Sequence, residues 1–351
     1  MKRSASIFKD LLSEARDKHE SRNRLVFWIS LILAAALLFL ALRGIDWVVL
    51  FTFLRDADYL YVALLVVWST LTYFFRAMRW RVLLSSQKNI LLINVFWANM
   101  AGYLGNNILP ARAGEFIRAA YIARKEDISL AFALATGITE RLVDLATLVT
   151  IAAASLFFVD AFPKPVQEVL KGFSVAAVAG VVFIFTLPLF HNLINRFFFS
   201  LPFLNQLLKS KLREVLRQFV EGVKTIARLE SSLSFLLFTA LIWLMDGIGM
   251  VVLALSLHES LTLAQSFLLI ASLGLSSAIP STPGYVGVYQ FVAMTVLVPF
   301  GFARESALAL ILLVQALNLV VVACCGGTGL WVGSRGISTI QTKKTEGEMH
   351  G

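Results

Sequence analysis

The most constraining feature of this sequence is a series of apolar segments, each long enough to cross a lipid bilayer. A bilayer core requires about 17–25 consecutive, mostly apolar residues in helical form. Four segments meet this length without an internal charge, namely 25–42, 59–75, 173–190 and 306–333. Two more, 142–160 and 233–257, qualify although they contain Asp144 and Asp246, respectively. We therefore predict six full transmembrane helices.

The composition excludes a soluble protein. Hydrophobic residues make up 58% of the chain and charged residues 15%, whereas a soluble domain has about 45–50% and about 25%. The adjacent Cys324 and Cys325 lie inside an apolar run, where neither a disulfide framework nor a redox or zinc motif is expected. We predict an all-α, polytopic integral membrane protein with no metal and no cofactor.

Charge distribution predicts the topology. Two further apolar stretches, 90–109 and 263–300, are interrupted by Asn, Gly and Pro. If the N-terminus is cytoplasmic and both stretches return to their side of entry, 26 of the 31 Lys and Arg residues lie in cytoplasmic segments. The outer segments then hold Arg43, Arg55, Lys164, Lys171 and Arg304. The positive-inside rule thus favours two re-entrant hairpins and cytoplasmic termini in a bacterial inner membrane.

The two interrupted stretches share a pattern in which a glycine follows a proline by four residues, at Pro110 and Gly114 and again at Pro280 and Gly284. Under the predicted topology they enter the membrane from opposite sides, as in the inverted repeats of many transporters. Prolines remove backbone donors, so the freed carbonyls must meet protein or water. A hydrated cavity between two inverted hairpins satisfies this need. The alternative is a pair of ordinary proline-kinked helices.

Polar residues are densest around the first interrupted stretch. A helix that starts after Pro110 would bring Glu115 beside Arg118, and Glu140 and Asp144 are four residues apart on one helical face. A helix N-terminus with nearby guanidinium groups suits an anion such as a lipid phosphate. The predicted headgroup site comprises Asn106, Asn107, Arg112, Glu115, Arg118, Glu140, Arg141 and Asp144. Structural salt bridges at the cytoplasmic rim are the alternative.

A second set of polar residues belongs to the other half of the chain. Asp246 lies near the centre of its span with no basic residue close in sequence, so we expect it to be protonated, paired or facing water. It is a candidate for proton coupling, or else a protonated acid bonded to a neighbouring helix. The outer cavity is predicted to involve Pro280, Pro283, Gly284, Gln290, Gln315 and Asn318, although hydrogen bonding between helices is the commoner role of such residues.

The remaining segments flank or interrupt one domain. Residues 1–24 form a basic amphipathic cytoplasmic segment, 25–333 the transmembrane domain, and 334–351 a flexible cytoplasmic tail. Within the domain, 191–232 is a cytoplasmic amphipathic segment suited to an anionic lipid surface. No nucleic-acid site and no common catalytic motif is present. The DxD sequence Asp56-Ala57-Asp58 lacks a nucleotide-binding context, and we interpret it as chance.

Several blocks together resemble a known family. Residues 106–118, 140–144 and 280–287, with Arg76-Ala77-Met78-Arg79-Trp80-Arg81, look like the signatures of the lysylphosphatidylglycerol synthase transmembrane region family, whose members are also called flippase-like domain proteins. The resemblance runs from about Arg76 to Gly333. It implies a lipid flippase; lysyl transfer is not implied, because the relatives' aminoacyltransferase domain does not follow. Many members have Glu where this chain has Gln290.

The resemblance and the residues together predict a lipid transporter that is not an enzyme. Its substrate would be an anionic, aminoacylated or polyprenyl-phosphate lipid, with the phosphate bound by Arg112 and Arg118. The carboxylates would orient these arginines or carry protons. A membrane-embedded lipid-modifying enzyme of glycosyltransferase type, or a non-catalytic membrane partner of a lipid-synthesis enzyme, are the alternatives, and the oligomeric state is open.

Overall fold

The computed structural model describes residues 31–109, 113–156, 229–277 and 283–349, with a few single positions between 158 and 179. Within these ranges the regular structure is helical and no strand occurs. A first helix, Leu31–Leu42, precedes the others. The labelled helices are α2 (Trp47–Arg55), α3 (Tyr59–Leu84), α4 (Leu92–Ile108), α5 (Gly114–Glu126), α6 (Leu130–Leu156), α10 (Leu229–Ser256), α11 (Leu263–Ser276), η3 (Pro283–Tyr285), α12 (Val288–Leu297), η4 (Val298–Phe300) and α13 (Arg304–Met349).

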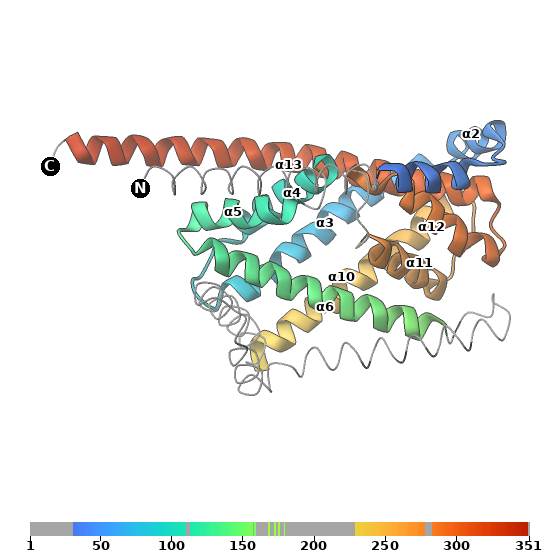
Figure 1. Ribbon diagram of the computed structural model, residues 1–351, viewed down its shortest axis with the longest axis horizontal. Coiled ribbons are helices and arrows are strands. Elements are labelled where there is room, and N and C mark those ends of the chain that lie inside the picture. The colour runs from blue at the N-terminus through green and yellow to red at the C-terminus, as the bar shows by residue number, and fades with distance from the viewer. Residues whose placement is uncertain are drawn as a thin grey trace, which may run out of the picture.

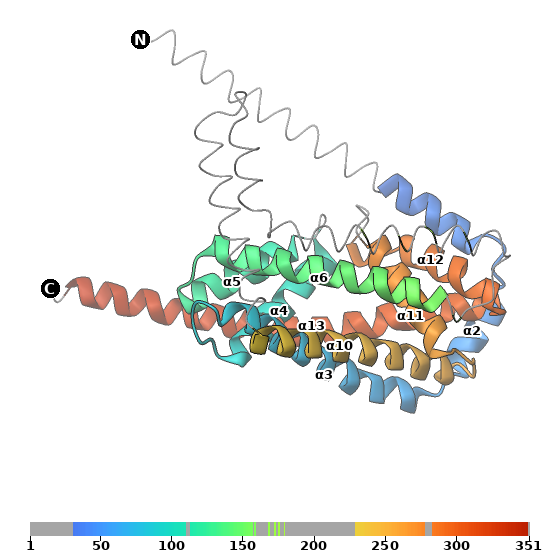
Figure 2. The same ribbon diagram turned by 90° about the horizontal axis from the view of Figure 1, so that it is seen from below.

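Four long helices, α3, α6, α10 and α13, run along the long axis of the molecule (Figure 2). Their directions follow from two apolar clusters near its opposite ends. One cluster contains Leu65 of α3 and Leu253 of α10, and the other contains Trp80 and Phe235 of the same two helices. α3 and α10 are therefore antiparallel. α13 runs parallel to α3 and α6 parallel to α10, the same relative directions that the charge-derived layout requires.

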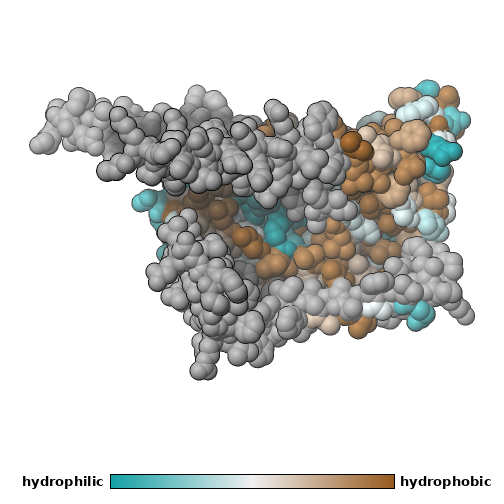
Figure 3. Space-filling model, in the orientation of Figure 1, coloured by the Kyte–Doolittle hydropathy of each residue, from teal (hydrophilic) through white to brown (hydrophobic). Residues whose placement is uncertain are grey.

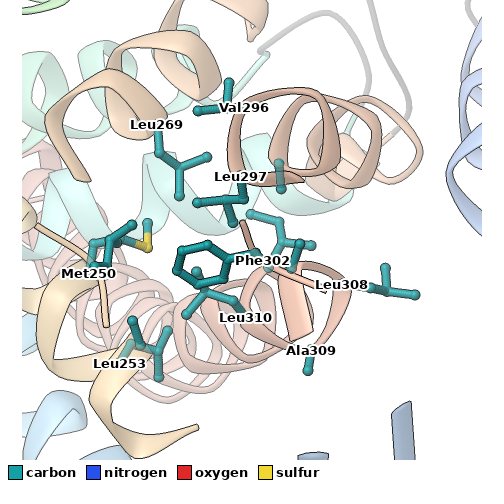
Figure 4. Packing of buried hydrophobic residues seen from close by; sticks show 14 of the residues in the cluster. Met250, Leu253, Leu269, Val296, Leu297, Phe302, Leu308, Ala309 and Leu310 are labelled. Carbon is teal, nitrogen blue, oxygen red and sulfur yellow. The ribbon is translucent and has the colours of Figure 1, made fainter. Parts of the chain in front are cut away.

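The first of these clusters contains more of the described buried apolar residues than the second. Leu269 of α11, Leu297 of α12 and Leu310 of α13 meet there with Met250 and Phe302, and all five are at most 8% exposed (Figure 4). Burying a large aliphatic or aromatic side chain contributes about 1.5–3 kcal/mol relative to exposure. This cluster therefore holds the second hairpin against the long helices.

Three described helices are long and apolar enough to cross a membrane: Tyr59–Leu84, Leu233–Ser256 and Arg304–Gly329. They coincide with three of the predicted spans. The predicted number of six transmembrane helices is not reproduced in full. The segment 173–190 lies outside the described residues, apart from single positions. α6 carries three charged residues within its apolar run. α6 also begins at Leu130, well before the predicted start at 142.

The predicted first span ends at Leu42, where the chain turns by 87° into α2. Gly44 has a φ of 77°, a left-handed conformation that glycine adopts readily. The Asp46 carboxylate then caps α2 by accepting from the Val48 and Val49 amides, and Asp58 caps α3 in the same way. Within the DxD sequence, Asp58 thus has a structural role as a helix cap.

Between the long helices lie two pairs of short helices, which we call the first hairpin (α4 and α5) and the second hairpin (α11, η3 and α12); they occupy different ends of the molecule (Figure 1). In the first hairpin, a Cβ at Gly105 would meet Gly114, and one at Gly102 would meet Arg118. These pairs proceed in opposite directions along the two helices, so α4 and α5 are antiparallel. α4 also contacts η3, so the two hairpins meet each other.

The outer surface is largely apolar. Leu60 and Val67 of α3 and Leu237 of α10 are each at least 64% exposed. Figure 3 shows hydrophobic residues over most of the coloured part of the visible face, with a hydrophilic patch set among them. An exposed apolar surface of this extent is expected of a protein surrounded by lipid.

Other predicted segments can be placed only in part. α13 continues as a helix to Met349 and so includes residues 334–349 of the predicted tail, since no proline interrupts it (Figure 1). The N-terminal segment 1–24 lies outside the described residues. So does the amphipathic segment 191–232, apart from residues 229–232, which begin α10.

Candidate functional site

A cavity of about 650 Å³ lies between the two hairpins and the long helices. The first hairpin contributes residues on both sides of its turn, namely Asn106, Asn107 and Glu115. The second hairpin contributes Ser277, Gly284 and Tyr285, also around its turn. The long helices add Tyr73, Arg76, Arg141, Asp246, Gln315 and Asn318. The turns of the two hairpins therefore converge on one cavity, whose wall combines charged and polar side chains with apolar ones.

Six charged side chains next to this cavity form a closed cycle of alternating sign, which we call the ion-pair ring. Its members are Arg79 of α3, Glu115 and Arg118 of α5, and Glu140, Arg141 and Asp144 of α6. Arg79 is its most deeply placed cation. One nitrogen of its guanidinium lies 2.8 Å from Glu140 and another lies 2.6 Å from Asp144. One arginine thus joins two carboxylates that are one helical turn apart on α6.

The rest of the ring connects α5 to α6. Glu140 also lies 2.7 Å from Arg118, and Arg118 lies 2.7 Å from Glu115. Glu115 is 3.0 Å from Arg141, which lies 3.4 Å from Asp144 and so closes the ring. Three cations face three anions, and the ring has no net charge.

Burial differs around the ring. The side chains of Arg79, Arg118 and Glu140 are at most 2% exposed, whereas Glu115 is 27% and Arg141 33% exposed. Only Glu115 and Arg141 among the ring members line the cavity. The ring therefore has a buried side that holds three helices together and an open side that faces the cavity.

Aromatic rings complete the buried side. The Arg118 guanidinium lies over Trp80 at 4.6 Å, and that of Arg79 lies over Phe235 at 5.5 Å. Such contacts compensate buried cations beyond their ion pairs. Removing one member of a buried ion pair leaves its partner uncompensated and costs about 3–5 kcal/mol. The ring is consequently a rigid support for the two residues that reach the cavity.

Asp246 has a partner that is distant in sequence. Its carboxylate accepts a hydrogen bond of 2.5 Å from Arg76 of α3, whose guanidinium also lies 5.6 Å from the Trp243 ring. Both charged residues line the cavity. Of the states expected for Asp246, pairing and contact with a cavity are the ones observed, because α3 and α10 pack side by side.

The second hairpin is held by uncharged groups. Gln290 accepts from the Gly287 amide at 2.7 Å and donates to Gln315 at 2.6 Å, and Gln315 donates to the Gly284 carbonyl at 2.9 Å. Asn318 accepts a hydrogen bond from the Tyr73 hydroxyl. Of the predicted outer residues, Gly284, Gln315 and Asn318 line the cavity, whereas Gln290 is 2% exposed and supports the turn.

The predicted asparagines stabilise the turn of the first hairpin. Asn106 accepts from the Gly114 amide at 2.9 Å, and Asn107 donates to the Tyr103 carbonyl at 3.0 Å. Arg112 lies outside the described residues, as does Pro280. Pro283 begins η3, and its side chain is not described. Glu140, Asp144 and Arg118 sit behind the cavity wall rather than on it.

Sequence reasoning did not place Arg76 and Arg79 in the site. They count there as topology signals after a span that ends at residue 75, whereas α3 continues to Leu84, buries Arg79 and leaves Arg76 15% exposed in the cavity wall. The available signal was their spacing of three residues, which puts them on neighbouring positions of one helical face. Where two arginines at helical spacing follow an apolar segment directly, the predicted helix should be extended to include them.

Two residues of the cavity wall retain buried donors without an acceptor among the described groups. They are Nε of Arg141 and Nε1 of Trp243. A buried donor without an acceptor costs about 1–3 kcal/mol. An acceptor atom of a bound ligand would remove this cost. Among the described residues, no group of three or more His, Cys, Asp or Glu is arranged to hold a metal ion.

Comparisons with known proteins identify the family. The model of the lysylphosphatidylglycerol synthase TM region matches residues 27–326, and so begins upstream of the motifs that carry the resemblance. A UPF0104 membrane protein of Methanocaldococcus jannaschii is 23% identical over 235 residues, which cover 66% of this chain and 95% of the relative. No solved structure matches the chain. With its ring and cavity inside the matched region, this chain belongs to the lysylphosphatidylglycerol synthase transmembrane region family of membrane proteins.

Proposed function

We propose that this protein moves a phosphate-bearing lipid between the leaflets of the bacterial inner membrane without changing the lipid covalently. The observation that carries the proposal is a cavity with charged side chains in its wall, at the meeting point of two hairpins within an apolar helical bundle. A lipid headgroup needs such a hydrated path, because an unsolvated charge in hydrocarbon is very costly. The acyl chains would remain in the surrounding lipid, along the apolar outer surface.

The arrangement of the hairpins supports this role. We propose that the first enters from the cytoplasm and the second from the outside, with both chain termini cytoplasmic. The relative directions of the four long helices agree with that layout. Contact between α4 and η3 then lies near the middle of the membrane, where inverted-repeat transporters bind their substrates. A site reached from both sides is what transport between leaflets requires.

The geometry assigns different roles to the predicted site residues. We propose that Arg141 and Arg76 contact the phosphate, because they are the described cations on the cavity wall. Arg118 is buried between two carboxylates, so it would orient Glu115 rather than bind the lipid. Arg112 lies between α4 and α5 in the sequence, outside the described residues, and remains a proposed phosphate contact. Asp246 is proposed to carry a proton when its pair with Arg76 opens.

A vesicle assay with headgroup-labelled lipids tests the proposal. Purified protein is reconstituted with one labelled lipid at a time, and the fraction accessible to an outside reagent is followed over time. Arg141→Ala should slow transport at least about tenfold, because hydrogen bonds to a charged group contribute about 1.5–3 kcal/mol. Arg124→Ala is the matched control, since Arg124 is exposed on α5 and does not line the cavity.

Other outcomes separate the alternatives. If no lipid of a broad panel moves, or if Arg141→Ala behaves as the wild type, the transport proposal fails. Conversion of a labelled lipid when nucleotide sugars are supplied would favour a lipid-modifying enzyme. Normal membrane assembly with no transport by any variant would favour a non-catalytic partner.

A further inference from the structure

The charged groups on the cavity wall are balanced. The described residues that line it include two cations, Arg76 and Arg141, and two anions, Glu115 and Asp246. Each cation is within ion-pair distance of one of these anions, at 2.5 Å for Arg76 and Asp246 and at 3.0 Å for Arg141 and Glu115. The described part of the cavity wall thus has both signs of charge and no net charge, as does the ion-pair ring beside it.

This balance disfavours a ligand that is only anionic. A phosphate that binds Arg76 draws the guanidinium away from Asp246 and leaves that carboxylate without compensation in a medium of low dielectric constant. At Arg141 the cost is smaller, because Glu115 keeps its ion pair with Arg118 at 2.7 Å. A ligand with one negative and one positive group avoids the cost, because its phosphate takes the arginine while its ammonium takes the carboxylate.

Aromatic side chains on the wall offer further contacts to a cation. Tyr285 and Tyr289 are stacked with their centroids 4.8 Å apart, and Tyr73 lies 5.0 Å from Tyr103. All four line the cavity. Ring faces attract ammonium groups, more strongly where water is excluded. Tyr73 is also within the long helix that carries Arg76, so the aromatic and ionic parts of the wall adjoin.

Two residues of the wall also carry donors whose hydrogen bonds are not used among the described groups. Nε of Arg141 and Nε1 of Trp243 are buried and have no acceptor among the described groups. Trp243 lies beside Arg76, at 5.6 Å from guanidinium to ring. These donors suit phosphate oxygens, which accept several hydrogen bonds each.

We infer that the cavity selects a zwitterionic headgroup, with one phosphate and one ammonium group, over headgroups of net negative charge. The part of the inference that concerns lipid movement rests on the proposed function. The part that concerns headgroup binding does not. It narrows the substrate to an amine-bearing phospholipid and places polyprenyl phosphates and unmodified anionic phospholipids among the poor substrates.

A transport arm tests this selectivity. Vesicles contain protein and one labelled probe with matched acyl chains, either phosphatidylethanolamine or phosphatidylglycerol, and a third set contains a polyprenyl phosphate. We expect phosphatidylethanolamine to move at least about tenfold faster than either anionic lipid, corresponding to one pair left uncompensated. Equal rates, or faster movement of phosphatidylglycerol, would overturn the inference while leaving the transport proposal intact.

A charge-changing variant gives a directional test. Asp246→Asn gives the lining a net positive charge, so the preference should shift towards phosphatidylglycerol by at least about tenfold. Asp127→Asn is the matched control, because Asp127 is exposed at the end of α5 and asparagine tolerates its left-handed backbone. The double variant Arg76→Gln with Asp246→Asn restores neutrality and should restore the wild-type order of lipids. An unchanged preference in Asp246→Asn, with the variant folded by thermal unfolding, would overturn the inference.

A binding arm does not depend on transport. In detergent, water-soluble glycerophosphoethanolamine and glycerophosphoglycerol are titrated while the fluorescence of the tryptophans, two of which line the cavity, is recorded. Saturable quenching by the first and at least tenfold weaker binding of the second is the expected result. Selective binding without any lipid movement would leave the inference standing and remove the transport proposal. Binding of the two compounds with equal affinity would overturn the inference.

Discussion

The two hairpins meet at one cavity but are held by different chemistry. The first is fastened to α3 and α6 by the ion-pair ring, whose buried members Arg79, Arg118 and Glu140 are at most 2% exposed. The second is fastened to α13 by neutral hydrogen bonds through Gln290 and Gln315. Breaking a buried ion pair leaves an uncompensated charge and is costly. Breaking a hydrogen bond between neutral amides costs less. The comparison indicates that the polar joint of the second hairpin is the easier one to break, while apolar packing also holds this hairpin.

The largest expected effect comes from opening the ring. Glu140→Ala removes one of the two carboxylate partners of both Arg79 and Arg118 and leaves the buried ring with a net positive charge, so we expect a loss of about 3–5 kcal/mol in unfolding free energy. Thermal unfolding in detergent measures it. Glu140→Gln, which keeps the shape and part of the hydrogen bonding, should lose less. Unchanged stability of Glu140→Ala would show that the ring does not fasten the first hairpin.

A smaller effect is expected where the first hairpin closes. A Cβ at Gly114 would lie 1.9 Å from the Gly102 carbonyl oxygen, so Gly114→Ala must push α4 and α5 apart. Overpacking of this kind costs about 3 kcal/mol at its upper range. Gly327→Ala is the control, since its Cβ would meet nothing within 4 Å among the described atoms. Equal unfolding temperatures of the two variants would contradict the close approach.

The second hairpin should respond more weakly. Gln290→Ala removes the acceptor of the Gly287 amide and the donor to Gln315, for an expected loss of about 2 kcal/mol. Because Gln290 holds Gln315, which lines the cavity, the variant should also alter transport rates more than stability alone explains. Comparing it with Glu140→Ala in both assays sharpens the contrast. A loss in stability as large as that of Glu140→Ala would remove the distinction between the hairpins.

The smallest effect is expected for an ion pair outside the ring. Lys88 lies 3.6 Å from Glu126, but its side chain is 49% exposed. Water and salt screen such a pair, so Lys88→Ala should cost about 0.5 kcal/mol. The variant calibrates the ring, because it also removes the cation of an ion pair, but from an exposed position. A loss above that of Gln290→Ala would mean that burial does not explain the strength of the ring.

Local pairings in the site were predictable, and distant ones were not. The contacts of Glu115 with Arg118 and of Arg141 with Asp144 follow from a spacing of three residues on a helix. The partners of Asp246 and Glu140 on α3 are separated from them by 170 and 61 positions. No periodicity connects residues so far apart, which is why Arg76 and Arg79 escaped the predicted site.

The sequence alone determined that the chain is helical and membrane-embedded, because apolar runs of spanning length have few other stable forms in lipid. It also determined where the helices break, since proline and glycine act on the local backbone. Tertiary structure decided which charges meet. An arginine near the end of a span can set topology, or it can become a buried member of an ion-pair ring. Which of the two occurs depends on the helix that packs against it. In Arg79 the second outcome prevails, because α6 presents two carboxylates at the depth where α3 places its guanidinium.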